Sequence, residues 1–178
     1  WTSFNEVVSI DSNCDFAVTH RPPMLKVRGN HGSINYEGYL YVIGGFDEYE
    51  LKECERFNVS EQRWEPIESL PKLTAEPSLI VSEPTKFLYA MGGNFGDPFD
   101  VIQRLSLDRM KWELLVLKLP SAADAIACFN LSDGQVGVIL CKNLYSFDFE
   151  TFTLVKDLAR NMTSDNGPSY YRDGILFC

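Results

Sequence analysis

The stretch LYVIGGF, Leu40 to Phe46, is an apolar run that ends in two glycines, Gly44 and Gly45. Glycine weakens a strand because it loses the most backbone entropy on folding and has no side chain to pack. The sequence LYAMGGN, Leu88 to Asn94, repeats the pattern 48 residues later with Gly92 and Gly93. A costly feature that recurs at a fixed spacing indicates an internal repeat.

Other landmarks follow each diglycine at the same distances. Twelve residues after the second glycine comes a large apolar residue, seven more lead to a tryptophan, and a Leu-Pro pair lies just beyond. These landmarks are Phe57, Trp64 and Leu70 in the first copy and Leu105, Trp112 and Leu119 in the second. The repeat therefore has a period of 48 or 49 residues.

The same frame divides the whole chain into three complete copies between two half copies. We expect a half blade over 1–27, blades over 28–74, 75–122 and 123–160, and a half blade over 161–178. The third copy is degenerate, with Leu140 and Cys141 in place of the diglycine, although Phe147 and Leu154 keep the spacing of seven.

Each copy has the pattern of four short strands, here called a to d. In the second copy we expect them near 77–82, 87–92, 100–107 and 111–117, with turn residues between them and almost no helix signal. Four-stranded units repeated every 40–50 residues predict an all-β protein, a β-propeller with one antiparallel sheet per blade. The diglycines then provide positive φ angles and close backbone approach, and the large apolar landmarks pack between blades.

The motifs of the first copy resemble the Kelch repeat. They are R-x-x-H-G-S from Arg28 to Ser33, GYLYVIGG from Gly38 to Gly45, RFN from Arg56 to Asn58, and Trp64. The resemblance implies about four blades' worth of a Kelch-type propeller that belongs to a larger ring of five to seven blades. As an alternative, the two half copies complete one another in a closed ring of four blades.

The composition argues against several classes of partner and indicates the cellular setting. The formal charge is −9 over 178 residues, which argues against nucleic acid and anionic membranes as partners. The five cysteines are odd in number and lack a C-x-x-C pair, so we expect no disulfide framework, no structural zinc and a reducing, intracellular setting, cytoplasmic or cytoskeletal. No apolar run reaches the roughly 20 residues of a membrane helix.

The sequence predicts no catalytic, cofactor-binding or metal-ligating residues, and we expect a protein that is not an enzyme. It has only two histidines, His20 and His31, and no phosphate loop or nucleophile elbow. Some copper radical oxidases share the propeller fold, and such an enzyme is the alternative. His31 falls inside the Kelch motif, where a structural or hydrogen-bonding role is expected.

The resemblance implies that the b–c and d–a loops share one face, which binds partner proteins. Residues expected on that face are mostly acidic or aromatic: Arg28, Asp47, Glu48, Tyr49, Glu50, Glu76, Phe95, Asp97, Phe99, Asp100 and Asp124. Opposite charge speeds association and aromatic side chains act as anchors, which favours a basic peptide or protein as partner. The alternative is that these acidic residues have no role in binding, because the loops of a chain with a charge of −9 are acidic in any case. The expected role is a scaffold, in a larger assembly, or an adaptor that recognises substrates of a ubiquitin ligase.

Overall fold

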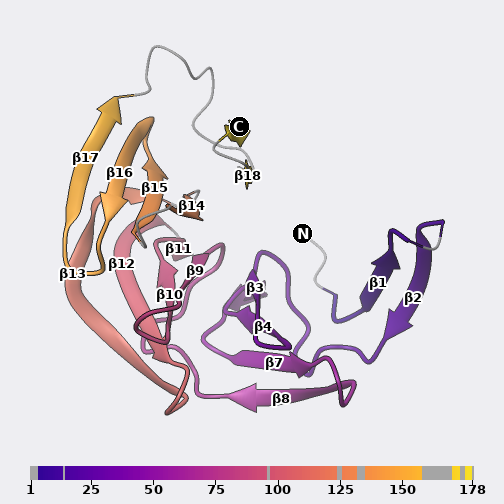
Figure 1. Cartoon of the computed structure of the whole chain (residues 1–178). Helices are drawn as coiled ribbons and strands as arrows, with labels where there is room; N and C mark the ends of the chain where they lie inside the picture. Colours follow the sequence, from indigo (N-terminus) through magenta and orange to yellow (C-terminus); the bar gives the residue numbers. More distant parts are fainter. Residues whose placement is uncertain are drawn as a thin grey trace.

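The computed structural model describes residues 4–13, 15–95, 97–123, 126–131, 135–157, 170–172 and 175–177, without the side chains at 95, 97–99, 170–172 and 175–177. All regular structure in these ranges is β-strand, as predicted. The sheets follow one another along an arc (Figure 1). No helix in the described ranges is long and apolar enough to cross a membrane.

The three complete copies form three antiparallel sheets, in which strands follow in chain order from the inner strand a to the outer strand d. The first blade contains β3 (Gly32–Tyr36), β4 (Tyr39–Ile43), β7 (Cys54–Asn58) and β8 (Arg63–Ile67). The second contains β9 (Ser78–Ser82), β10 (Phe87–Met91), β12 (Asp97–Ser106) and β13 (Lys111–Ala123). The third contains β14 (Ala127–Asn130), β15 (Val136–Leu140), β16 (Asn143–Phe147) and β17 (Phe152–Asp157). Successive four-stranded antiparallel sheets of this kind are the blades of a β-propeller, the architecture that the repeat predicted.

Two further hairpins lie at the ends of the described chain. β1 (Val7–Asp11) pairs with β2 (Ala17–Arg21), and β18 (Tyr170–Arg172) pairs with β19 (Ile175–Phe177). Within the described ranges each hairpin is a separate two-stranded sheet, so the two do not complete a common blade in this structure.

The b–c loops differ between blades more than the sequence suggests. In the first blade the loop folds into the small hairpin β5 (Phe46–Asp47) and β6 (Tyr49–Glu50), and in the second β11 (Asn94–Phe95) pairs with the start of β12. Strands c and d of the second blade are longer than predicted, because bulged pairing continues from Val101 as far as Phe99 and Ala123. In the third blade Cys141 and Lys142 alone connect b to c, both with positive φ.

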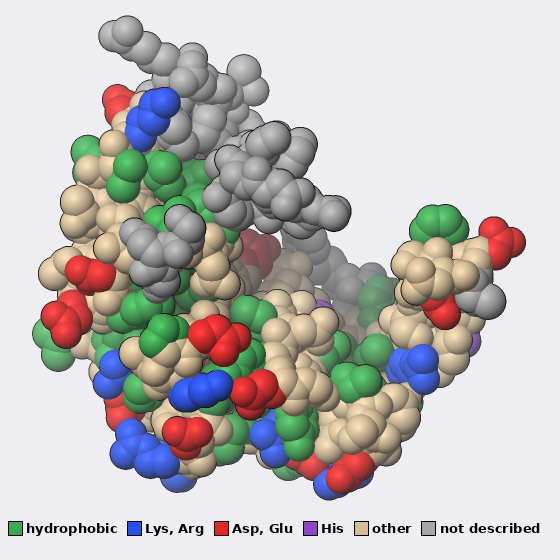
Figure 2. All heavy atoms as spheres, viewed as in Figure 1, with side chains coloured by type: hydrophobic (Ala, Val, Ile, Leu, Met, Phe, Trp, Pro, Cys, Tyr) green, Lys and Arg blue, Asp and Glu red, His purple; other side chains and the backbone are tan. Residues whose placement is uncertain are grey.

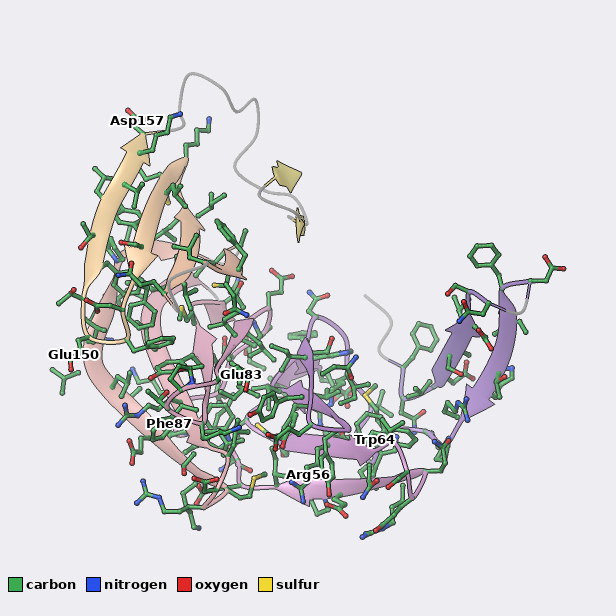
Figure 3. The ribbon with its side chains drawn as sticks, in the orientation of Figure 1. Arg56, Trp64, Glu83, Phe87, Glu150 and Asp157 are labelled. Atoms are coloured by element: carbon green, nitrogen blue, oxygen red, sulfur yellow. The ribbon has the colours of Figure 1, made fainter. Side chains whose placement is uncertain are left out.

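Apolar side chains fill the spaces between neighbouring blades, as predicted for the landmark residues. Trp64 is 8% exposed and packs on Phe57 at 5.2 Å between ring centroids, in a cluster with Met24 from the segment before the first blade (Figure 3). Trp112 is also 8% exposed and lies with Leu105 and Leu70 in the cluster between the first and second blades. Trp1, expected to be more exposed, lies outside the described residues.

The structure explains why strand b ends in two glycines. Gly44, Gly45, Gly92 and Gly93 all have positive φ, between 60° and 110°. A side chain on Gly44 would overlap the carbonyl oxygen of Thr74, which also accepts a 2.9 Å hydrogen bond from the amide of Gly45. The diglycine is therefore the point where one blade meets the backbone that enters the next.

Alanine at Gly44 should be more destabilising than alanine at Gly38. Both glycines have positive φ, which costs a residue with a side chain about 1–2 kcal/mol, but nothing lies within 4 Å of a Cβ at Gly38. The overlap with Thr74 should add about 1–3 kcal/mol for Gly44→Ala. Chemical denaturation of both variants checks this, and equal losses of stability would contradict the proposed role of close approach. Gly96, a position expected to tolerate substitution, lies outside the described residues.

Candidate functional site

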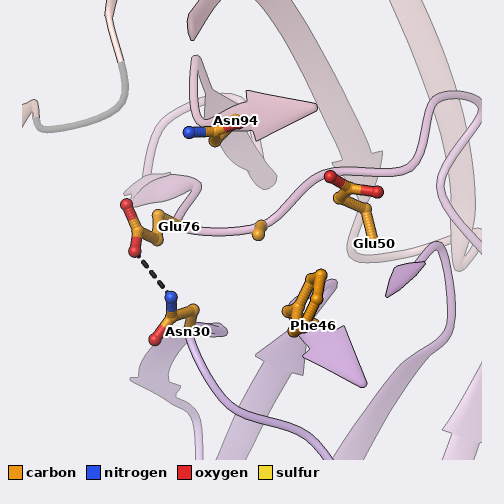
Figure 4. Close-up of a pocket in the computed structure, with 6 residues that line it drawn as sticks. Asn30, Phe46, Glu50, Glu76 and Asn94 are labelled. Atoms are coloured by element: carbon orange, nitrogen blue, oxygen red, sulfur yellow. Dashed lines mark hydrogen bonds between the residues drawn. The ribbon is translucent and has the colours of Figure 1, made fainter. Parts of the chain in front are cut away.

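A pocket of about 250 Å³ opens at the junction of the first and second blades (Figure 4). Its lining comes from the two b–c loops and from the segments that enter strand a in each blade. The lining residues are Asn30, Phe46, Glu50, Ala75, Glu76 and Asn94. Two of the six are acidic, one is aromatic, and none is Lys or Arg.

Backbone hydrogen bonds hold these pieces in place. Gly29 and Phe46 exchange both amide–carbonyl bonds at 2.9 Å, so the first b–c loop is fixed to the start of its own strand a. Ala75 and Asn94 do the same in the second blade, at 3.0 and 2.8 Å. Equivalent bridges in successive blades place the two loops on the same side of the sheets.

Asn30 and Glu76 connect the two blades across the pocket. The Asn30 side-chain amide donates to the Glu76 carboxylate at 2.7 Å, and the Glu76 amide donates to the Asn30 carbonyl at 2.6 Å (Figure 4). Both residues have positive φ, 50° and 56°. They occupy the same place in successive copies, since each follows the bridging residue, Gly29 or Ala75, by one position.

This equivalence corrects the predicted alignment of strand a. Arg28, Glu76 and Asp124 were expected together on the loop face, and a constant offset of 48 residues would make them equivalent positions of successive copies. The a–b turn has two residues in the first blade and four in the second, so β3 and β9 are offset by 46. Thr74 is the true equivalent of Arg28. In the first blade the Arg28 guanidinium donates to the carbonyl oxygen of Gly44, and in the second the Thr74 hydroxyl lies 3.3 Å from the carbonyl oxygen of Gly92.

Arg28 itself is a correction, because it was expected on the exposed loop face and is buried inside the molecule. It is 2% exposed, and its guanidinium forms a 2.7 Å ion pair with Glu55, also 2% exposed. Arg28 also donates to the carbonyl oxygen of Glu53 at 2.9 Å, and Glu55 accepts the amide of Leu25 at 2.7 Å. The pair ties strand c of the first blade to the segment that enters it.

Four of the remaining predicted residues, Asp47, Glu48, Tyr49 and Asp100, lie outside the pocket lining. Tyr49 is 74% exposed beside the exposed Glu48, while Asp47 and Asp100 lie 4.0 and 3.2 Å from the ammonium groups of Lys26 and Lys118. The face seen in Figure 2 carries acidic and basic side chains interspersed. The side chains of Phe95, Asp97 and Phe99, and all of Asp124, lie outside the described residues. Of the predicted acidic residues, the pocket brings together Glu50 and Glu76.

Four pocket residues were missed by sequence reasoning: Asn30, Phe46, Ala75 and Asn94. Phe46 and Asn94 each directly follow a diglycine, so the repeat frame could have singled them out. Asn30 could be found only by allowing the a–b turn to change length. Glu55 was missed because a buried carboxylate is rare without a partner, and its partner was assigned to the surface.

His31 lies beside the buried ion pair and is half-buried, with an Nδ1 atom that is buried without a hydrogen-bond partner among the described residues. The half-buried location of His31 agrees with a structural role, but its Nδ1 atom makes no hydrogen bond within the described residues. Burial, aided by the Arg28 guanidinium, lowers the pKa of His31 below 6.5. The other histidine, His20, is exposed on β2.

The lowered pKa of His31 predicts a loss of stability in mild acid. Below pH 6.5 the unfolded chain binds a proton at this residue that the folded chain resists, so folding stability falls as pH drops through 6.5. His31→Asn should reduce this part of the pH dependence, measured as midpoints of chemical denaturation from pH 8 downwards. Identical pH profiles for the two proteins would show that protonation of His31 does not lower folding stability.

Comparisons with known proteins agree with the fold of the first blade. The model of the Kelch motif matches residues 28–71, which include the first blade and the segments on either side of it. Kelch-like protein 38 from Rattus norvegicus and from Mus musculus are each 26% identical over 92 residues, covering 51% of this chain and 16% of the relative. Residues 28–71 therefore match a Kelch motif, and the part aligned with these relatives spans about one sixth of their length.

Proposed function

We propose that this chain is a non-catalytic protein-interaction module, and that the pocket between its first two blades receives a basic segment of a partner protein. The observation that carries the proposal is the composition of the pocket wall: two carboxylates, Glu50 and Glu76, with the ring of Phe46 and no Lys or Arg. A Lys or Arg side chain gains from both carboxylates and from contact with an aromatic face. Tyr49, 74% exposed beside the pocket, supplies a further anchor.

The proposed binding surface does not extend to the third blade. Its b–c connection is the two-residue turn at Cys141 and Lys142, so it contributes no loop comparable to those of the first two blades. The proposed site therefore belongs to one blade junction, and the other acidic residues of the loops act at longer range. Their contribution is to the rate of association and to its dependence on salt.

A charge-reversal experiment tests the proposal. The double variant Glu50→Lys and Glu76→Lys should lose about tenfold in affinity for Lys/Arg-rich peptides at low salt, since each exposed charge contributes about 0–1 kcal/mol. The matched control, Glu6→Lys with Glu150→Lys, makes the same change in net charge at exposed sites just before β1 and on the turn before β17. The probe is a displayed library of basic peptides, with charge-reversed copies as the negative set.

Equal loss in both variants would assign binding to net charge and not to the pocket. Capture that is unchanged in the double variant would remove Glu50 and Glu76 from the site. Either result overturns this assignment and leaves the fold untouched.

The wider role that we propose is adaptor or scaffold work in an intracellular assembly. Kelch-type resemblance supports two forms, a substrate-recognition subunit of a ubiquitin ligase and a structural component, including one of the cytoskeleton. Among the described residues Cys54, Cys128 and Cys141 are free thiols, and burial raises the pKa of Cys54 to about 12, so it serves packing and not reactivity. Affinity purification of the full-length protein separates the two forms: copurifying ligase subunits support the first, cytoskeletal proteins the second.

A further inference from the structure

Most backbone amides in the wall of the pocket between the first two blades are already in use. Phe46, Ala75, Glu76 and Asn94 each donate the backbone N–H to a carbonyl oxygen nearby, at distances from 2.6 to 3.0 Å. An amide carries a single hydrogen, so four of the six lining residues offer no backbone N–H to a ligand.

The side chains of the wall add mainly hydrogen-bond acceptors. The carboxylates of Glu50 and Glu76 are acceptors only, and they lie on opposite sides of the pocket in Figure 4. Asn30 and Asn94 each have an amide oxygen as well as an NH2 group, and Asn30 already donates to Glu76 at 2.7 Å. The wall is therefore rich in acceptors, poor in donors and negatively charged, which suits a ligand with a positive charge and several N–H groups.

The size of the pocket fits one side chain. Its volume of about 250 Å³ is below the roughly 300–1,000 Å³ of sites that hold drug-sized ligands. The half-buried ring of Phe46, together with Ala75, forms the apolar part of the wall, and Phe46 lies on the same side as Glu50 (Figure 4). A lysine side chain matches this arrangement, because its methylene chain packs on apolar surface while its ammonium group reaches acceptors.

The hydrogen bond from Asn30 to Glu76 favours lysine over arginine. A guanidinium gains most when two parallel N–H groups reach both oxygens of one carboxylate. One oxygen of Glu76, Oε1, already accepts the Asn30 side chain. An ammonium group is a point charge with three donors, so it can take a single oxygen from each carboxylate and another from a side-chain amide.

We propose, on the basis of the function proposed above, that this pocket recognises the modification state of one lysine in the partner: it binds the free ammonium group and excludes acetyl-lysine. Acetylation removes the charge, leaves one N–H donor and adds a carbonyl oxygen that requires a donor. The wall offers that oxygen few donors and places it between the carboxylates of Glu50 and Glu76. A polar group enclosed without a hydrogen-bond partner is costly, so acetylation of this lysine releases the partner from the blade junction.

A series of peptides tests the proposal on the 178-residue chain. The probe is the tightest binder from the displayed library of basic peptides in which every basic position is lysine. It is synthesised with each lysine in turn left free, acetylated or replaced by arginine. Acetylation of one lysine should weaken binding about tenfold and acetylation of the others about twofold or less, because only the first loses hydrogen bonds to charged groups. Arginine at the sensitive position should weaken binding about threefold.

A matched pair of double variants locates the effect. Glu50→Gln with Glu76→Gln removes both charges but keeps the side-chain size and an acceptor for Asn30, and the loss on acetylation should fall to about twofold. Glu6→Gln with Glu150→Gln makes the same change in net charge at exposed sites outside the pocket, and the loss should stay at about tenfold.

Three results would overturn the proposal while a basic partner remains. The first is equal weakening by acetylation at every lysine, which indicates an effect of net charge. The second is arginine that binds as tightly as lysine at the sensitive position, which removes the preference for lysine. The third is an undiminished loss on acetylation in the variant Glu50→Gln with Glu76→Gln, which places the lysine elsewhere.

Failure of the proposed function itself gives a different result. Either no peptide of the library binds the chain, or the affinity of the unmodified peptide is the same for the wild-type chain and for Glu50→Gln with Glu76→Gln. Both outcomes reject the pocket as the site of a basic segment, and recognition of acetylation is rejected with it.

Discussion

Replacing Trp64 by alanine should lower the free energy of unfolding by about 3–5 kcal/mol, the usual cost of removing a large buried aromatic side chain. The indole is 8% exposed, packs on Phe57, and donates from Nε1 to the carbonyl of Pro22 at 2.8 Å. The substitution removes both the packing between the first blade and the N-terminal segment and the hydrogen bond that joins them. Chemical denaturation gives the free energy directly.

Two further variants show which part of the loss comes from packing. Trp64→Phe keeps most of the apolar contact and loses the bond to Pro22, so it should lose less stability than Trp64→Ala. Val116→Ala, at a side chain that is 97% exposed on β13, should change stability by less than about 0.5 kcal/mol. If Trp64→Ala were as mild as Val116→Ala, the packing of aromatic landmarks between blades would be refuted.

Replacing Glu55 by alanine should also be strongly destabilising, by about 3–5 kcal/mol, because it leaves the guanidinium of Arg28 buried without its partner. Arg28 and Glu55 side chains are 1% and 2% exposed, and water cannot take the place of the lost carboxylate. Leu25 loses the acceptor of its amide in the same step.

The matched control is Glu61→Ala, which breaks an ion pair with Arg63 between side chains that are 51% and 58% exposed. Exposed pairs contribute about 0–1 kcal/mol, so the control should be near neutral. The double variant Arg28→Met with Glu55→Met removes both charges and should recover part of the stability lost by Glu55→Ala. A double variant less stable than the single one would contradict the view that an unpaired charge causes the loss.

The fold could be predicted from the sequence because each landmark residue meets a local physical requirement. A diglycine that needs positive φ and close approach, and a tryptophan that needs a neighbouring blade, leave marks that recur at 48 or 49 residues. Those marks located the strands to within a few residues. The extended β13 was missed, since bulged pairing with the b–c loop has no such local mark.

The candidate site was predicted only in part, because it depends on small differences between copies. Two extra residues in one a–b turn shift Glu76 from the place of Arg28 to that of Asn30. Arg28 was placed on the surface because charge alone does not reveal a buried partner, here 27 residues away in sequence. Glu50 and Glu76, by contrast, were placed on one face by the repeat frame, and they share the pocket.

The most direct test of the proposed binding surface is hydrogen exchange on the chain with and without a captured basic peptide. The pocket predicts slower exchange at Phe46–Glu50, around Ala75 and Glu76, and at Asn94, with little change elsewhere. Protection confined to the turns on the opposite side of the blades, around Glu37 and Lys86, would contradict it.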